Sequence, residues 1–206
     1  MRKFPAKIIS YAFHPLMMPT YLFIIIILYL PDALQPMSVK VMLYVLLLIF
    51  ITTFMIPLFS LLGLRTALNI SSLHLEKRKE RILPFSFITL FYGLTTYLFH
   101  TKIEVNDFLL SILLGATVVV GIVTIVTVFY KISVHAAGVG CMLGSMLAMI
   151  YRFPTHHLLW QFCMITLLAG IILSARLSLK AHTNSEVYAG FGLGFAACFL
   201  SVYLLA

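Results

Sequence analysis

Long apolar runs alternate with short polar segments along the whole chain. A transmembrane helix needs about 20 consecutive, mostly apolar residues. The runs that approach or exceed this length cover residues 14–30, 41–63, 83–99, 108–130, 134–151, 158–174 and 187–206. The pattern therefore predicts an all-α integral membrane protein, a bundle of about six to seven transmembrane helices. No sequence repeat or linker divides residues 1–206, so a single polytopic membrane domain is expected.

The composition agrees with this prediction. With 62% hydrophobic and 10% charged residues, the chain of 206 residues is too apolar for a soluble domain of its size. No small-residue cleavage site follows the basic start and the first apolar run, so this run is expected to remain as a span. Cys141, Cys163 and Cys198 lie within apolar runs without paired or metal-ligand spacing. They are expected to be small buried side chains, with no disulfide and no metal site.

Two prolines refine the predicted helices. Pro57 lies inside the second apolar run, where a proline kinks a helix or loosens its last turns. Pro84 stands at the start of the third run, and proline is well suited to the first turn of a helix. The third span is therefore expected to begin at Pro84.

Three polar segments carry the residues with reactive side chains. They cover residues 65–84, 131–135 and 174–186, and two apolar runs separate each neighbouring pair. Because two spans return a chain to the side from which it started, all three segments are expected at the same face of the membrane. The sequence therefore predicts one shared site.

The basic residues are distributed unevenly between the two predicted faces. Only Lys40, Lys102 and Arg152 belong to the face opposite the site. The face of the site holds Arg2, Lys3, Lys7, Arg65, Lys77, Arg78, Lys79, Arg81, Lys131, Arg176 and Lys180. The positive-inside rule then places the N-terminus and the site in the cytoplasm. These cations lie in short loops between spans, so bilayer lipids with anionic headgroups are the expected partners and nucleic acid is not.

The segment 174–186 holds three groups that suit the chemistry of a phosphate. Arg176 follows directly on an apolar run, where a charge is costly unless it snorkels or finds an anionic partner. His182 can act as a nucleophile or base, and Glu186 can orient it if the last helix starts early enough to place both on one face. Thr183 to Glu186 also fits a capping box, which would give Glu186 a purely structural role. Both roles stay open.

The segment 131–135 resembles a second helix start, with Ser133 as N-cap and His135 just inside. Taken alone, it indicates a capped helix with an interfacial histidine. Free N–H groups and the helix dipole favour an anion at a helix start, so a phosphate could sit between the two starts.

Small residues at close-packing spacing occur in the two helices that these segments open. Gly140 and Gly144 lie in the first, and Gly190 and Gly194 lie in the second. Such spacing lets membrane helices approach closely. If these two helices touch, His135 and His182 meet.

These motifs resemble the signatures of the type 2 phosphatidic acid phosphatase (PAP2) superfamily of membrane lipid phosphatases. Arg176, His182 and Glu186, followed by Val187-Tyr188-Ala189-Gly190, resemble its third signature, Arg-x5-His-x3-acid. The segment Ile132-Ser133-Val134-His135 resembles the second, Pro-Ser-Gly-His, and lies two spans earlier as in the family. Lys77 to Pro84, with Arg81, loosely matches the first, Lys-x6-Arg-Pro. The PAP2-like core would cover about residues 65–206, with the better match over 131–206.

The resemblance implies a phosphatase that needs no metal or other cofactor. His182 would attack the phosphorus and form a phosphohistidine, Glu186 would orient it, and His135 would protonate the leaving alcohol. The phosphate oxygens would be held by Arg176, Arg81, Ser133, Lys131 and Lys77. The implied substrate is a lipid phosphate or diphosphate whose apolar tail stays in the bilayer. The expected location is a bacterial inner (cytoplasmic) membrane, where relatives commonly work on the outer face, opposite to the face that the charges indicate here.

The chain departs from these signatures at several positions. Glu186 stands in place of an aspartate, and Ala175 stands where the family has serine before arginine. Ile132 and Val134 replace proline and glycine. These departures keep open a catalytically silent protein that binds or scaffolds lipid phosphates. A transporter or channel is a third class, disfavoured because the acidic residues lie in loops or at span ends, which leaves no carboxylate inside the membrane for ion coupling.

Overall fold

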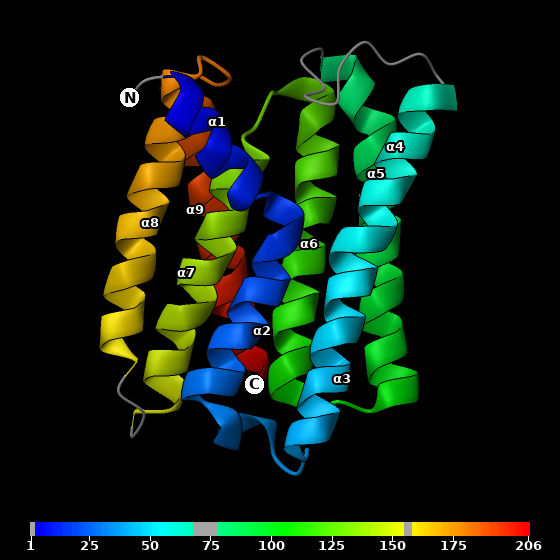
Figure 1. Cartoon of the computed structure of the whole chain (residues 1–206), viewed down its shortest axis with the longest axis vertical. Coiled ribbons are helices and arrows are strands. Elements are labelled where there is room, and N and C mark those ends of the chain that lie inside the picture. Colours follow the sequence, from blue (N-terminus) through cyan, green and yellow to red (C-terminus); the bar gives the residue numbers. More distant parts are fainter. Residues whose placement is uncertain (1–2, 68–77, 155–157) are drawn as a thin grey trace.

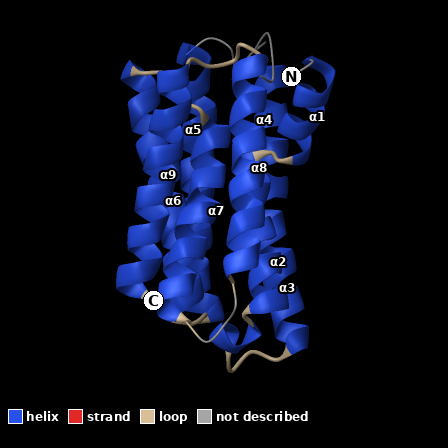
Figure 2. Cartoon of the chain, turned by 90° about the vertical axis from the view of Figure 1, so that its left-hand side faces the viewer, coloured by secondary structure: helices blue, strands red, loops and turns tan. Residues whose placement is uncertain are grey.

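The computed structural model describes residues 3–67, 78–154 and 158–206, and every regular element in these ranges is a helix. The longer helices are α1 (Lys3–Ala12), α2 (Met18–Tyr29), α3 (Val39–Phe50), α4 (Ile56–Ala67), α5 (Arg78–Leu98), α6 (Asp107–Phe129), α7 (Val134–Arg152), α8 (Leu159–Ser178) and α9 (Asn184–Leu205). They form an upright bundle with the N-terminus at one end and the C-terminus towards the other (Figure 1). Most helices run roughly along the long axis (Figure 2).

Seven helical segments of the described ranges are long and apolar enough to cross a membrane. They are Phe4–Tyr29, Val39–Leu64, Arg81–Ile103, Asp107–Phe129, Val134–Arg152, Leu159–Ser178 and Asn184–Leu205. The predicted all-α membrane bundle is therefore confirmed. Each predicted apolar run corresponds to one of these segments.

The first span begins earlier than the apolar run at residue 14 indicates, because the basic start folds as α1. This helix ends at Ala12, and the short helix η1 (Pro15–Met17) joins it to α2. The extended backbone of His14 precedes Pro15, as the residue before a proline prefers, and the His14 side chain caps η1. The first span is thus a broken helix, with His14 at the break.

Two further boundaries correct the sequence predictions. Pro84 lies inside α5, which already begins at Arg78, so the expectation that this span starts at the proline is wrong. Helix α8 continues to Ser178, which places Arg176 in its last turn rather than in a polar loop. Both helices run past their apolar stretch, because a helix also satisfies the backbone of the polar residues at the membrane surface.

Irregular turns lie at two other helix ends. The chain passes from α3 to α4 through the π-helical turn η3 (Ile51–Met55), which ends two residues before Pro57. Pro57 is predicted to kink this run or to loosen its last turns, but the irregular turn precedes the proline and the last turns are regular helix in α4. A second π-helical turn, η4 (Phe99–Ile103), extends α5 beyond the predicted apolar run 83–99. Left-handed Glu104 follows it and ends the helix.

Helices α7 and α9 pack backbone against backbone through their glycines. A Cβ atom on Gly194 would clash with the carbonyl oxygen of Ala137, and one on Gly144 would clash with that of Phe195. At the upper end of the pair, the N–H of Ser133 donates to the carbonyl of Glu186 at 3.1 Å. The close approach that the glycine spacing allows therefore does occur between these helices. It joins the starts of the two helices that carry His135 and Glu186.

Threonine pairs join α5 to α6. The hydroxyls of Thr89 and Thr124 lie 2.8 Å apart, and so do those of Thr96 and Thr117. Hydrogen bonds between polar side chains of neighbouring helices commonly stabilise helix association within the bilayer, where the hydrophobic effect contributes little. The pairs hold α5 and α6 together as one wall of the bundle.

The cysteines differ in burial. Cys198 is buried and Cys141 is partly buried, but Cys163 is exposed on α8, and all three are free thiols. The prediction of a buried side chain is therefore wrong for Cys163. An apolar run in a membrane helix has a lipid-facing side as well as a core-facing one, and the run alone does not distinguish them.

Candidate active site

A cavity of about 840 Å³ enters the bundle from the end that carries the N-terminus. Its lining residues come from α1, η1, α2 and from each helix between α4 and α9. Polar and basic side chains line the part near the membrane surface, and apolar side chains line the part that continues inward. The volume lies within the range of about 300–1,000 Å³ that is usual for small-molecule sites.

Most of the candidate residues from the sequence meet at this cavity. The lining residues include Arg81, Lys131, His135, Arg176 and His182, from three polar segments far apart in the chain. Ser133 and Glu186 lie behind the lining, and Lys77 lies outside the described residues. The segments predicted to share a membrane face therefore do share a cavity.

The link between α8 and α9 places His182 at the cavity. The N–H of Ala181 donates to the carbonyl of Arg176, and the N–H of Lys180 donates to that of Leu177. This is the hydrogen-bond pattern of a Schellman motif, in which the residue after the helix is left-handed and is usually glycine. Here that residue is Lys180, with φ of 52°. The reversal directs the chain into the short segment that holds His182.

Glu186 both caps α9 and binds His182. The Thr183 hydroxyl accepts from the N–H of Glu186 at 3.4 Å, and Glu186 Oε2 accepts from the N–H of Thr183 at 3.4 Å, which completes the capping box. The same carboxylate oxygen lies 2.7 Å from Nδ1 of His182. An ionised carboxylate only accepts, so Nδ1 carries the proton and the lone pair lies on Nε2. His182 therefore has the tautomer that a nucleophilic Nε2 requires.

Burial controls the charge of His182, which is only 7% exposed. Desolvation lowers the pKa of His182 to about 4, which outweighs the raising effect of Glu186, and the positive charges of Arg81 and Arg176 lower it further. The imidazole is thus neutral at pH 7. A neutral ring keeps the lone pair that a nucleophile needs.

Two of the predicted phosphate-binding residues have structural partners. The Ser133 hydroxyl accepts from the N–H of Ala136 at 3.4 Å and caps α7, as the helix-start interpretation predicts. Nζ of Lys131 donates to the carbonyl of Ala181 at 2.9 Å and so ties the start of α7 to the link before α9. Lys131 still lines the cavity, whereas Ser133 is completely buried.

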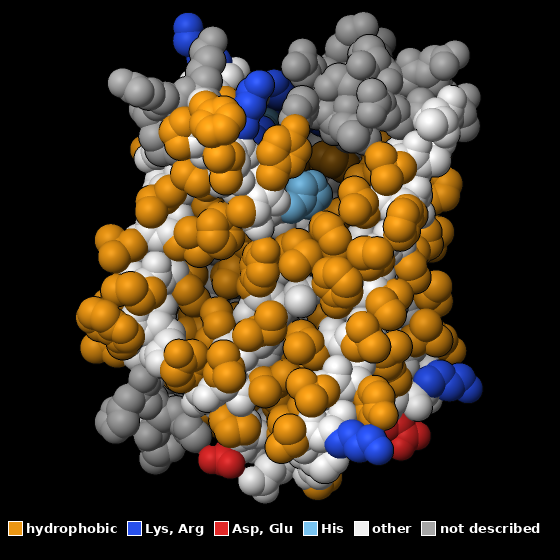
Figure 3. Space-filling model, in the orientation of Figure 1, with side chains coloured by type: hydrophobic (Ala, Val, Ile, Leu, Met, Phe, Trp, Pro, Cys, Tyr) orange, Lys and Arg blue, Asp and Glu red, His pale blue; other side chains and the backbone are white. Residues whose placement is uncertain are grey.

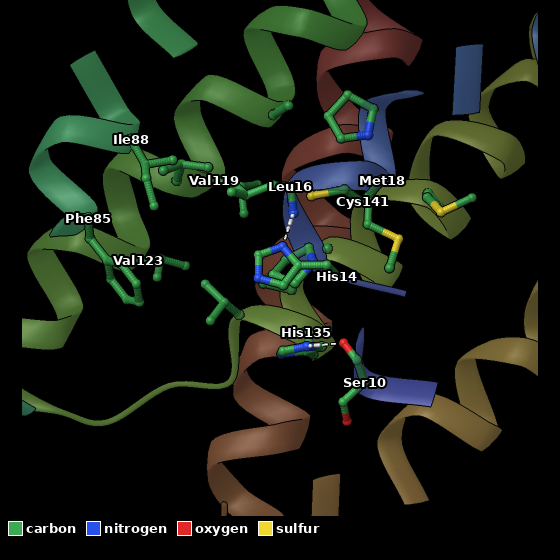
Figure 4. Close-up of a pocket in the computed structure, with 18 of the residues that line it drawn as sticks. Ser10, His14, Leu16, Met18, Phe85, Ile88, Val119, Val123, His135 and Cys141 are labelled. Atoms are coloured by element: carbon green, nitrogen blue, oxygen red, sulfur yellow. Dashed lines mark hydrogen bonds between the residues drawn. The ribbon is translucent and has the colours of Figure 1, made fainter. Parts of the chain in front are cut away.

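Ser10 of α1 contacts two of the predicted site residues. Its carbonyl accepts from Nε2 of His135 at 3.1 Å, and its hydroxyl accepts from Nη1 of Arg176 at 3.1 Å. The buried Nε of Arg176 has no hydrogen-bond partner among the described residues. Such a donor in a cationic cavity suits an oxygen of an anionic ligand. Figure 4 shows Ser10, His135 and His14 grouped at the cavity.

The first span also contributes to the cavity, which the sequence did not predict. Lys7, Ser10 and His14 all line the cavity, and the rings of His14 and His135 lie 5.9 Å apart between centroids. Lys7 and Ser10, three residues apart, lie on one face of α1, and His14 follows at the break after this helix. Two residues at helical spacing are a weak signal for a site-facing α1, and the break that brings His14 to the cavity has no such signal.

The cavity has an excess of positive charge. Lys7, Arg81, Lys131, Arg176 and Lys180 line it, and no Asp or Glu does so among the described residues. In Figure 3, Lys and Arg atoms lie at both ends of the molecule, and those at the upper end lie near a hollow beside a histidine that is visible at the surface. Within the described ranges, no group of three or more His, Cys, Asp or Glu side chains is placed to hold a metal ion. The arrangement suits an anionic ligand.

The chain matches no family model, no curated protein and no solved structure.

Proposed function

We propose that this protein is a membrane phosphatase that hydrolyses a lipid phosphate or diphosphate monoester, as a divergent member of the PAP2 superfamily. The observation that carries the proposal is the pairing of His182 with Glu186 at 2.7 Å, at the cationic end of a cavity whose apolar walls continue into the bundle. A lipid phosphate has the same division into an anionic headgroup and an apolar tail. The four-residue spacing and the tautomer of His182 add further support.

The reaction would proceed in two steps through His182. The Nε2 lone pair attacks the phosphorus, the bond to the leaving oxygen breaks, and a protonated His135 gives its proton to that oxygen. Water then attacks the phosphohistidine with His135 as base, which releases inorganic phosphate and restores both rings. Arg176 and Arg81 neutralise the charge of the phosphoryl group as it transfers. No metal or cofactor takes part in this scheme.

The location belongs to the same proposal. The protein would lie in the inner (cytoplasmic) membrane of a bacterium, with the cavity opening to the cytoplasm. Eleven of the 14 Lys and Arg residues belong to the cavity end by the order of the spans, which is the distribution of a cytoplasmic face.

Phosphate release by the purified protein tests the proposal. The substrates would be phosphatidic acid, phosphatidylglycerol phosphate, isoprenyl diphosphates and lipid A phosphates. The wild type should release phosphate from at least one of them, and His182→Ala should abolish the release because the covalent route then has no first step. His100→Ala, which changes an exposed histidine outside the cavity, is the matched control and should retain the activity. Equal activity of the His182 and His100 variants would reject the mechanism.

A silent lipid-phosphate-binding or scaffold protein is the second candidate. The contacts of Ser10 favour it, because they occupy both the His135 proton and one Arg176 donor that turnover would use. In that case lipid phosphates should bind, Arg176→Ala should weaken the binding, and no lipid of the panel should be hydrolysed.

A further inference from the structure

The apolar part of the cavity extends well below the cationic end. On α7 the lining runs from Val134 to Ser145, and on α5 it runs from Arg81 to Tyr92. Each stretch spans about three turns, or about 16 Å at 1.5 Å per residue, and this depth includes the cationic end with Arg81 and His135. Below these two residues, the lining from Phe85 to Tyr92 and from Ala137 to Ser145 is about 11 Å deep. Two helices on opposite sides of the cavity therefore give the same depth.

This inner part has the surface of a hydrocarbon site. Phe85, Ile88, Val119 and Val123 form one wall, and Leu16 stands across from them (Figure 4). The cationic lining residues all lie near the membrane surface, in α1, at the start of α5, in the last turn of α8 or in the segments that precede α7 and α9. Small side chains, including Ala116 and Cys141, leave room between the walls.

The depth indicates what fits. The hydrocarbon core of a bilayer is about 30 Å thick, so one chain spans about 15 Å of one leaflet, and an apolar slot about 11 Å deep takes most of that length. A ligand held by its anionic group at His182 and Arg176 has to continue either sideways into the bilayer or down this slot. The slot lies directly below these residues, and its walls are apolar apart from Tyr92 and Ser145 at the inner end.

We propose that the inner cavity takes a hydrocarbon chain of the phosphate-bearing lipid out of the bilayer and into the bundle, between α5 and α6 on one side and α2 and α7 on the other. This inference rests on the proposed function for the identity of the headgroup. It replaces the expectation from the sequence that the tail stays in the bilayer.

The slot selects chains by shape. Lipid tails are as apolar as the slot walls, so transfer from bilayer to slot gains little from the hydrophobic effect, and the fit of the chain decides the affinity. Cys141 lies two turns below the start of α7. A larger side chain at this position would narrow the slot. Cys163 on α8 is the same residue type, is exposed and lies outside the cavity. The two cysteines form a matched pair.

Binding of alkylphosphonates to the protein in lipid nanodiscs tests the slot. A phosphonate is not hydrolysed, so the measurement does not depend on turnover. Cys141→Phe should weaken the binding of dodecylphosphonate about tenfold or more, because a ring then occupies the path of the chain. The shorter chain of butylphosphonate ends above Cys141, so butylphosphonate should bind equally to the wild type and to Cys141→Phe. Cys163→Phe should bind both probes like the wild type, which also controls for partition of the longer probe into the lipid.

A second pair of phenylalanine variants should show the same loss of dodecylphosphonate binding. This pair tests the slot if Cys141→Phe does not fold. Ala116→Phe adds bulk inside the slot, and Val118→Phe adds it on the exposed side of α6. Equal binding of dodecylphosphonate to the slot and control variants would overturn the proposal. A loss confined to the slot variants in a protein that hydrolyses no lipid would support the slot and reject the phosphatase function.

Discussion

At the start of α9, a single carboxylate oxygen of Glu186 contacts both the His182 ring and the N–H of Thr183. The capping role and the orienting role, which are alternatives in the sequence, therefore occur together. The cap fixes the carboxylate, and the fixed carboxylate sets the tautomer of His182. Because the charge matters only for the second role, the two can be separated by substitution.

Glu186→Gln and Thr183→Ala make that separation. Glu186→Gln keeps an acceptor for the ring but removes the charge that orients and stabilises it, so phosphate release should fall about tenfold or more while the melting temperature changes little. Thr183→Ala removes a capping hydroxyl and should lower the free energy of unfolding by about 1 kcal/mol with activity largely retained. Full activity of Glu186→Gln would assign this residue to structure alone.

The pKa of His182 gives a second prediction at this scale. An ordinary histidine titrates near pH 6.5, but burial lowers the pKa of His182 to about 4. The unfolded chain then binds more protons between these values, so this group's contribution to stability is complete above about pH 6.5 and declines as the pH falls towards 4. Acylation of His182 by diethylpyrocarbonate, followed by peptide mass spectrometry, should be half-maximal near pH 4. A half-maximum near 6.5 would show that the ring is not desolvated.

Among the elements, the pair α7 and α9 determines whether the two histidines share a cavity. Its glycines allow the backbones to touch, and the bond from Ser133 to Glu186 aligns the two helix starts. Any side chain at the contact would separate the helices that carry His135 and Glu186. Stability and activity should therefore fall together when this contact is disturbed.

Gly194→Ala and Gly192→Ala test the contact with the same substitution two residues apart. A methyl group at Gly194 meets the carbonyl of Ala137, so this variant should lose about 1–3 kcal/mol of stability and most of its activity. At Gly192 nothing lies within 4 Å of the added atom, and the higher helix propensity of alanine should leave stability equal or up to about 1 kcal/mol greater. Thermal unfolding in detergent and phosphate release provide the two readouts. Equal loss in both variants would contradict the packing account.

The sequence predicted the helices well but not all of their ends. Length and hydropathy are sufficient to predict the spans, because a protein backbone inside the bilayer has few alternatives to a helix. The helical turns that carry Arg176 and precede Pro84 lie at the membrane surface, where hydropathy is not informative. The reversal after α8 was also missed, because Lys180 takes the left-handed position at which glycine is the usual signal.

In the whole molecule, the order of the spans brings three distant polar segments to one cavity, which counting crossings predicts. The participation of α1 could not be predicted in this way, because the contacts of Ser10 with His135 and Arg176 depend on how the broken first span folds back. Tertiary contacts also decided that Ser133 acts as a cap and that Lys131 binds a carbonyl. A sequence pattern names the residue type but not its partner.

Orientation in the membrane is a prediction at the same scale. The basic residues favour a cytoplasmic N-terminus, and seven spans then place the C-terminus on the opposite side. Reporter fusions at the two ends should therefore show a cytoplasmic N-terminus and an external C-terminus. An external N-terminus with a cytoplasmic C-terminus would place the cavity on the outer face, and two cytoplasmic ends would contradict the number of spans.

Trapping the covalent intermediate tests the central claim most directly. The protein would be mixed with a lipid substrate labelled in its phosphate, denatured in alkali, in which phosphohistidine survives, and digested for mass spectrometry. His135→Ala should accumulate label on His182, most with a substrate whose leaving group needs no proton, because attack can still occur while the steps that use His135 slow by about 10² to 10⁴. No label should appear in His182→Ala. Turnover of lipid phosphate by the wild type with label on no histidine, or on a histidine other than His182, would contradict the account.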